Sequence, residues 1–297
     1  MDIKVVNYTS LKELKELADK NNLSIGEYVL EEQILSIEIS REEIIDRMRK
    51  QYQVMKESIN DGLTVPTKLK IEKQDQGKIF LKYVESGKSI FDEFIGKAIA
   101  RAIAVAELNA SMGRICASPT AGSCGILPAV IVTMSEKYNF KEKDIINALF
   151  AAAGIGLVIA NTMSISGATS GCQAECGAAT AMAVASLTEL LGGSNDKVLD
   201  AAAISIKNIE GLVCDPVASL VECPCIKRNA NGAISAILAA DMAISGMKSI
   251  ISIDEVLLSA KEVGMKMASE FRETAEGGLA KTESGRAFWE KIFSSKK

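Results

Sequence analysis

All seven cysteines of this 297-residue chain lie between positions 116 and 225, and the chain contains no histidine. Three of the cysteines fall within twelve positions in GLVCDPVASLVECPCIKRN, residues 211–229. Pro216 and Pro224 favour extended or turned backbone there, so helix packing does not explain these sulfurs. Thiols placed in a loop, without the imidazoles that many metal sites use, indicate chemistry carried by sulfur.

Three interpretations of the thiols stay open on spacing alone. Cysteines are often small buried core residues. Four thiolates also hold zinc, but the paired C-x₂-C spacing typical of zinc modules does not occur in this sequence. Thiolates in loops between apolar helices suit an iron–sulfur cluster. Cys223 and Cys225 share one side of an extended segment, so spacing does not choose between them.

The composition excludes several classes of protein. The chain is 48% hydrophobic and 24% charged with a net charge of −4, which is typical of a soluble globular protein and argues against a nucleic-acid partner. Its charged N-terminus does not fit a signal peptide. The apolar run Ala148–Ala160 is too short for a membrane span and predicts a buried helix. We therefore expect a cytoplasmic protein with reduced thiols and no membrane partner.

The first sixty residues predict helices. Capping-box sequences, in which a serine and a later glutamate satisfy free N–H groups, begin at Ser10, Ser24 and Ser40. Asn60-Asp61-Gly62 predicts a helix stop. Residues 63–78 predict a loop with at most one short strand, and helical periodicity resumes over 79–87 and 89–113.

The middle of the chain predicts a buried bundle. Only five charged residues lie between 145 and 206, and helices this apolar must be enclosed by others. The fold class is therefore mainly α: a small N-terminal helical region over 1–62, then a helical bundle over 63–297 whose cysteine-bearing loops lie between buried helices. The helices of the bundle are expected over 127–136, 144–160, 173–191, 197–210, 230–247 and 254–271.

Two loops of small residues precede apolar helices and suit an anion. They are PTAGSCG, 119–125, and SGATSG, 166–171. Backbone N–H groups at such helix starts converge on oxyanions, with Thr120, Ser123 and Ser166 as the candidate side-chain contacts. The alternative is that these residues are ordinary helix caps.

A general base is harder to find without histidine. Glu175, three residues after Cys172, is one of the few charges in the apolar region. It is either a base with a shifted pKa or an acidic residue that favours a helix start.

Three long motifs resemble one known family. SMGRICASPTAGSCGILPAV, NTMSISGATSGCQAECGAATAMA and GLVCDPVASLVECPCIKRNANGA occur in the order found in the α chain of iron–sulfur-dependent L-serine dehydratase, also called L-serine ammonia-lyase. The resemblance runs from about Ser89 to Phe293 and includes ETAEGGLAKTESGRAFWEKIF. It implies that 63–297 is an iron–sulfur catalytic domain.

The resemblance also implies a cofactor and its ligands. Three cysteines hold a [4Fe–4S] cluster in that family, and they correspond here to Cys172, Cys214 and Cys225. Cys176 and Cys223 would then be packing residues. Three ligands leave one iron open, to act as a Lewis acid on the β-hydroxyl of L-serine. Loss of the α-proton and of water gives an enamine, which hydrolyses to pyruvate and ammonia.

The family is built either as one chain or as an α and a β chain. This sequence matches only the α portion, so a β chain is the expected partner and the source of the missing histidine. Two departures stand out. The family's glycine-rich segment SGLTGGDAxKL reads LKIEKQDQGKIFLKY here, and no cysteine stands in the final IFSSKK.

Three other functions are alternatives to this one. A pyridoxal-phosphate dehydratase would have an α/β pattern with a glycine-rich phosphate loop after a strand, which this sequence lacks. An L-cysteine desulfidase would use the same open iron on a thiol leaving group. A catalytically altered iron–sulfur sensor or regulatory subunit is favoured only by the changed glycine segment.

Overall fold

The computed structural model describes residues 8–37 and 39–294. No β-strand occurs within these ranges, where one isolated bridge joins Cys214 and Arg272, so the predicted mainly α fold is confirmed. The α-helices, in chain order, are α1 (Leu11–Lys20), α2 (Ile25–Ile37), α3 (Arg41–Thr64), α4 (Gln76–Glu85), α5 (Glu93–Ala110), α6 (Ile126–Tyr138), α7 (Glu142–Thr162), α8 (Gly167–Ser170), α9 (Cys172–Leu190), α10 (Asn195–Lys207), α11 (Cys225–Ile244), α12 (Ile253–Lys266) and α13 (Glu283–Phe293). Short 3₁₀ turns are η1 (Val217–Ser219), η2 (Ser269–Phe271) and η3 (Gly278–Lys281).

The three predicted helix starts are confirmed. Helices α1, α2 and α3 each begin one residue after the serine of their capping sequence. At Ser24 the box is reciprocal, since its hydroxyl accepts from the Glu27 N–H at 3.2 Å and its own N–H donates to the Glu27 carboxylate at 2.9 Å. At Ser10 and Ser40 the serine hydroxyl accepts, but the glutamate bonds elsewhere. Ordinary capping chemistry thus begins all three helices.

The predicted stop at residues 60–62 is wrong, because α3 continues to Thr64. Gly62 lies inside the helix and against α5, where a Cβ would come within 2.4 Å of the Ala104 carbonyl oxygen. The glycine therefore permits close helix packing and does not end the helix. Helix α4 in turn begins at Gln76, so the connecting loop is 65–75 and contains no strand.

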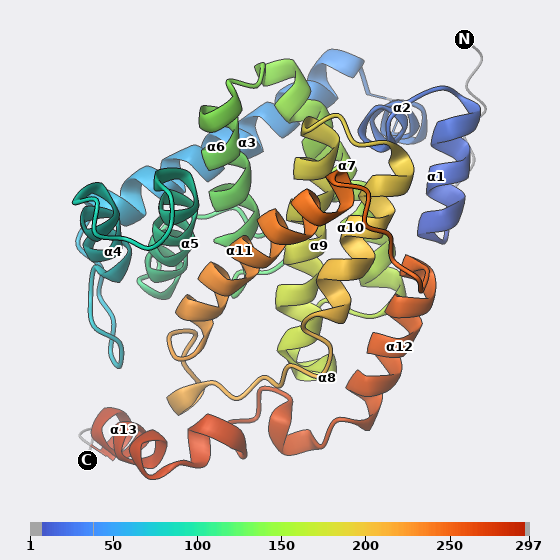
Figure 1. The fold of residues 1–297 in the computed structure, drawn as a ribbon. Coiled ribbons are helices and arrows are strands. Elements are labelled where there is room, and N and C mark those ends of the chain that lie inside the picture. Colours follow the sequence, from blue (N-terminus) through green and yellow to red (C-terminus); the bar gives the residue numbers. More distant parts are fainter. Residues whose placement is uncertain (1–7, 38, 295–297) are drawn as a thin grey trace.

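Helix α9 is the centre of the bundle, with α6, α7, α10 and α11 packed around it (Figure 1). It is rich in alanine, and nearly all of its side chains are buried. Small side chains on a central helix let its neighbours approach closely and fill the interior. One continuous hydrophobic core extends from Leu11 to Ala260. The N-terminal helices therefore share this core, and the boundary expected at residue 62 lies inside α3.

Helix α7 is long and apolar enough to cross a membrane by length and composition alone. However, 67% of its most apolar window is buried inside the protein, which is typical of a core helix. It contains the apolar run 148–160 and agrees with the buried helix predicted there.

Three features of the C-terminal half differ from the sequence prediction. Helix α12 ends at Lys266, five residues before the expected end at 271. Helix α11 begins at Cys225, five residues before the expected start at 230. Helix α13 was not predicted; Thr282 caps it by accepting from the Gly285 N–H at 3.1 Å. Beyond α12 the chain runs along one end of the bundle to α13, which packs on η1 and η3 (Figure 1). This places the C-terminal segment beside the cysteine-rich stretch.

A carboxylate of α9 joins the N-terminal helices to this core. Glu189 accepts hydrogen bonds from the Ser24 hydroxyl at 2.8 Å, the Gly26 N–H at 3.0 Å and the Asn147 amide at 3.1 Å. Burial raises the pKa of Glu189 from 4.5 to about 7. The folded protein therefore binds this proton more tightly than the unfolded chain does. The resulting stability is fully present below pH 4.5 and is lost as the pH rises through 7.

We expect Glu189→Gln to flatten the dependence of stability on pH, because glutamine resembles the protonated side chain. The free energy of unfolding of the unmodified protein should fall by up to about 3 kcal/mol more than that of the variant across this pH range. Urea titrations at several pH values measure this difference. Glu85→Gln, at an exposed glutamate of α4, is the control. Equal pH dependence in Glu189→Gln and the unmodified protein would contradict the assignment.

Candidate active site

Four cysteines gather where α9, α11 and the segment before η1 meet. We call Cys172, Cys176, Cys214 and Cys225 the thiol site. The sulfurs of Cys172 and Cys176 lie 3.3 Å apart, and Cys172 also contacts Cys214. Cys225 lies close enough for its charge to raise the pKa of both Cys176 and Cys214, after larger effects of Cys172 and burial. All four are buried.

Two of these thiols begin helices. Cys172 is the first residue of α9 and Cys225 is the first residue of α11. The N-terminus of a helix carries a partial positive charge, which favours a thiolate over a thiol. Because a helix was expected only from residue 230, the sequence did not predict that Cys225 begins one.

The Gly-Cys-Gln sequence explains how Cys172 reaches its position. Gly171 has a φ of 74°, and a Cβ there would lie 2.8 Å from the Leu212 carbonyl oxygen, so only glycine fits. The Gln173 N–H donates to the same oxygen at 2.9 Å. Its buried amide also accepts from the Gly211 N–H at 2.7 Å and donates to the Ala260 carbonyl at 2.8 Å. Cys172 is thereby fixed beside the segment that carries Cys214.

Cys214 is held by the C-terminal segment. Its N–H donates to the Phe271 carbonyl at 2.8 Å, and its carbonyl accepts from the Glu273 N–H at 2.8 Å. The next residue, Asp215, accepts from Arg228 at 3.0 Å and from the Leu279 N–H at 2.8 Å. The backbone of Phe271, Glu273 and Leu279 therefore holds the Cys214 segment in position.

Arg228 is the cation nearest the thiols. Its guanidinium donates to the Val213 carbonyl at 2.8 Å, pairs with Asp215 and contacts Cys172. The pKa of Cys172 is held well below its usual value by hydrogen bonds from Cys176 and Cys214 and then by the charge of Arg228, although burial opposes this. Cys172 is thus the thiol most readily ionised at this site.

The structure distinguishes Cys225 from Cys223. Cys225 faces Cys172, Glu175 and Arg228, whose charges act on it. Cys223 is half-buried, and the nearest charges are those of Glu72 and Lys227. Of the two, only Cys225 belongs to the thiol site, which favours it as the ligand.

The predicted substrate residues Thr120 and Ser123 lie together beside the thiol site. The Thr120 hydroxyl donates to Glu175 at 2.5 Å and lies 2.9 Å from the Ser123 hydroxyl. Burial, together with the charges of Cys172 and Glu273, raises the pKa of Glu175 to about 7, against a lowering by the Thr120 hydrogen bond. Glu175 therefore gains and loses a proton near neutral pH.

Ser166 is half-buried at the start of α8, and its hydroxyl makes no hydrogen bond within the described ranges. It precedes Gly167, where a Cβ would lie 3.0 Å from the Cys214 sulfur. Ser166 is thus near the thiol site but is not joined to Thr120 or Ser123. Cys116 and Cys124 lie outside the thiol site, and burial raises the pKa of Cys124 to about 12.

The loop that departs from the family pattern also touches this region. The buried carboxylate of Glu222 accepts backbone N–H groups of Lys70, Ile71 and Glu72 at 2.8 to 3.1 Å. Glu72 in turn pairs with Lys227 at 2.6 Å. The altered loop is therefore fixed directly to the segment that carries Cys225.

Sequence reasoning missed five residues of this site: Gln173, Asp215, Arg228, Asn229 and Glu273. All lie inside the quoted motifs. Gln173, Asp215 and Asn229 are polar yet buried, and a polar side chain next to a motif cysteine is a signal for a positioning role. No local pattern indicates that Glu273 returns to Cys214 from about sixty residues away.

The arrangement of the thiols bears on which metal group fits them. In residues 8–37 and 39–294, no group of three or more His, Cys, Asp or Glu side chains is arranged to hold a single metal ion. An iron–sulfur cluster uses one thiolate for each bound iron, so its cysteines surround the cluster and need not converge on one point. Soft, buried thiols at two helix N-termini fit such a cluster.

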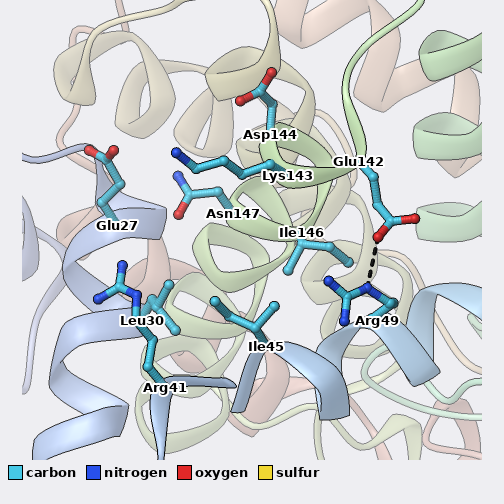
Figure 2. Close-up of a pocket in the computed structure, with 10 residues that line it drawn as sticks. All are labelled: Glu27, Leu30, Arg41, Ile45, Arg49, Glu142, Lys143, Asp144, Ile146 and Asn147. Atoms are coloured by element: carbon cyan, nitrogen blue, oxygen red, sulfur yellow. Dashed lines mark hydrogen bonds and ion pairs between the residues drawn. The ribbon is translucent and has the colours of Figure 1, made fainter. Parts of the chain in front are cut away.

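A cavity of about 510 Å³ lies elsewhere, between α2, α3 and the start of α7 (Figure 2). Its two arginines form ion pairs, Arg41 with Glu31 and Arg49 with Glu142, the latter at 2.7 Å. The far end of α7 leads to α8 and the thiol site, so the helix length of roughly 30 Å separates the two places. None of the predicted site residues lines this cavity.

These contacts define a helical protein with a site built from three cysteine-bearing segments and a Thr/Ser loop. The chain belongs to the serine dehydratase alpha chain family, whose model matches residues 20–280. It is 44% identical to "L-serine dehydratase, alpha chain" of Peptoniphilus asaccharolyticus, over 93% of this chain and 94% of that protein. It is 42% identical to "Probable L-serine dehydratase, alpha chain" of Bacillus subtilis, over 96% and 95%. "L-serine dehydratase" of Helicobacter pylori is 37% identical over 93% of this chain but only 62% of its own length.

Asn229 connects the Thr/Ser loop to Cys225. Its fully buried amide accepts from the Gly125 N–H at 2.9 Å and donates to the carbonyls of Gly122 and Cys225 at 2.8 and 3.0 Å. We expect Asn229→Ala to lower the free energy of unfolding by about 2 kcal/mol or more, because buried backbone groups lose their partners. Urea unfolding measures the loss. Asn231→Ala, at an exposed position of the same helix, should change it little, and equal losses would refute the role of Asn229.

Proposed function

We propose that this chain is the α chain of an L-serine ammonia-lyase that converts L-serine to pyruvate and ammonia with a [4Fe–4S] cluster. The observation that carries the proposal is the meeting of Cys172, Cys214 and Cys225, from three distant motifs, beside Thr120, Ser123 and Glu175. Relatives named L-serine dehydratase support the reaction. A cytoplasmic location would keep the thiols reduced.

Cys172, Cys214 and Cys225 would hold the cluster. The donor set is soft and buried, and Cys172, at the start of α9 and in contact with Arg228, is its most readily ionised member. Burial and neighbouring charges raise the pKa of Cys214 and Cys225, so binding of the cluster would have to displace their protons. When bound, a cluster with three protein ligands supplies an iron with an open position, a Lewis acid that makes the β-hydroxyl of serine a better leaving group. Cys176 and Cys223 would pack around it.

The remaining residues would bind the substrate and move its protons. The loop 119–125, with Thr120 and Ser123, would receive the carboxylate of serine, and Ser166 would approach it from the other loop. Glu175 is the chain's own candidate for taking up the α-proton, since its pKa is raised to about 7. Serine loses this proton and then water, and hydrolysis of the enamine uses one water and releases ammonia.

A β chain would complete the enzyme. The relatives named alpha chain are covered almost fully by this sequence, whereas the Helicobacter pylori protein is covered over only 62% of its length. The sequence provides no histidine for acid–base catalysis. We therefore propose that a separate chain supplies the region that the longer relative has in addition, including an acid–base residue.

The ligand assignment predicts which thiols the cluster needs. Protein prepared without oxygen should be brown and contain about four irons per chain. Cys172→Ala, Cys214→Ala and Cys225→Ala should each lose the iron, because none of three ligands is redundant. Cys176→Val and Cys223→Val should keep it, since these swaps change mainly packing. Iron analysis and visible absorption measure this. Iron lost from Cys223→Val but kept in Cys225→Val would show the choice to be wrong.

If a β chain supplies the acid–base residue, activity should depend on its presence. The iron-loaded chain alone should form pyruvate slowly, and adding the β chain should raise the rate by about a hundred- to ten-thousand-fold, the usual size of acid–base help. The assay measures pyruvate from L-serine under anaerobic conditions with the cluster content matched in both samples. Full turnover without a second chain would remove the need for the partner and would direct attention to Glu175.

A further inference from the structure

Glu273 lies at the thiol site although nothing in the function above uses it. A Cβ built at Gly167 would lie 3.0 Å from the Cys214 sulfur and 3.3 Å from a Glu273 carboxylate oxygen, so both side chains face the same point of α8. The charge of Glu273 contributes to the raised pKa of Glu175, Cys214 and Cys225, after burial and other larger effects. Its carboxylate therefore faces residues from three separate segments.

The backbone at Glu273 is held in an unusual conformation. Its φ is 65°, in the left-handed region that residues other than glycine seldom adopt. The bond from its N–H to the Cys214 carbonyl, at 2.8 Å, fixes it there. Such conformations persist where surrounding contacts demand them and are concentrated at functional sites. This backbone conformation directs the side chain of Glu273 toward the thiol site.

No positively charged side chain neutralises the carboxylate of Glu273 in the described residues. Glu273 is exposed, and its carboxylate has no ion pair or hydrogen bond with any residue in 8–37 or 39–294. The nearby cation, Arg228, is already bound to Asp215 and to the Val213 carbonyl. Glu175 and Cys172, when ionised, add further negative charge. An accessible carboxylate among these groups attracts a small cation.

We propose that Glu273 binds the α-ammonium group of the amino-acid substrate. This inference rests on the proposed function and adds a residue to it. The loop 119–125 and Glu273 approach the thiol site from different segments, so they would hold the carboxylate and the ammonium of one zwitterion apart. Glu273 thereby selects α-amino acids over hydroxy acids of the same shape and is a substrate-binding residue.

The test is Glu273→Gln, which keeps the size of the side chain and removes its charge. With the holoenzyme and its second chain, KM for L-serine should rise by about ten- to a hundredfold, the range expected for losing a charged hydrogen bond, while kcat changes little. Glu273→Asp should lie between. Glu276→Gln, an exposed glutamate three residues away, is the matched control and should behave as the unmodified enzyme.

Two further readouts separate binding from damage to the site. Iron content and visible absorption should be unchanged in Glu273→Gln. Inhibition by glycerate, which has a hydroxyl where serine has its ammonium, should not weaken. An unchanged KM, equal weakening of serine and glycerate, or a loss confined to affinity for the second chain would overturn the inference. If the unmodified enzyme forms no pyruvate from L-serine, the proposed function itself fails.

Discussion

The ion pair between Asp215 and Arg228 is the contact on which the site depends. Its atoms lie 3.0 Å apart, with side chains only 5% and 16% exposed. Taking two charges out of water costs free energy that attraction alone often fails to offset, so a buried pair is retained where further hydrogen bonds satisfy it. Asp215 also accepts the Leu279 N–H, and Arg228 also donates to the Val213 carbonyl. The pair therefore joins α11, the Cys214 segment and the C-terminal segment.

This junction has consequences for the chain around it. Gly278 has a φ of 57°, and a Cβ there would lie 2.4 Å from the Asp215 carboxylate, so the turn beside the pair requires glycine. The bridge from Cys214 to residues 271–273 continues the same connection. Helix packing around α9 supplies stability, whereas these polar contacts determine where the thiols lie. Packing of the alanine-rich helices alone would not determine the positions of the loops at the end of the bundle.

The sequence predicted the helical elements better than the site. Apolar helices such as α7 and α9 were located within one to two residues, because burial of a whole helix leaves a long uncharged pattern. The start of α11 was missed because Lys227, Arg228 and Asn229 look like a solvent-exposed loop, although two of them face the site. Gly62 was misread because a glycine that ends a helix and one that lets two helices touch look alike in sequence.

The residues of the candidate site also fall into two groups: those that a local pattern predicts, and those that only long-range contacts bring to the site. Thr120, Ser123 and Glu175 were named from local composition, and the structure brings them within hydrogen-bonding distance. Ser166 came from a similar loop but lacks such a contact. Spacing did not separate Cys223 from Cys225; the family resemblance did, and the structure brings only Cys225 to the thiol site. Glu273 was not predicted, because a segment near the far end of the chain returns to Cys214. Long-range contacts of this kind have no local pattern.

The most direct test is to expose anaerobically prepared protein, together with the proposed β chain, to air in steps. Visible absorption and pyruvate formation from L-serine are then measured on each sample. An iron–sulfur site with an open iron predicts that brown absorption and activity fall together, and that both return after anaerobic reconstitution with iron and sulfide. Full activity in colourless, iron-free protein would contradict the account.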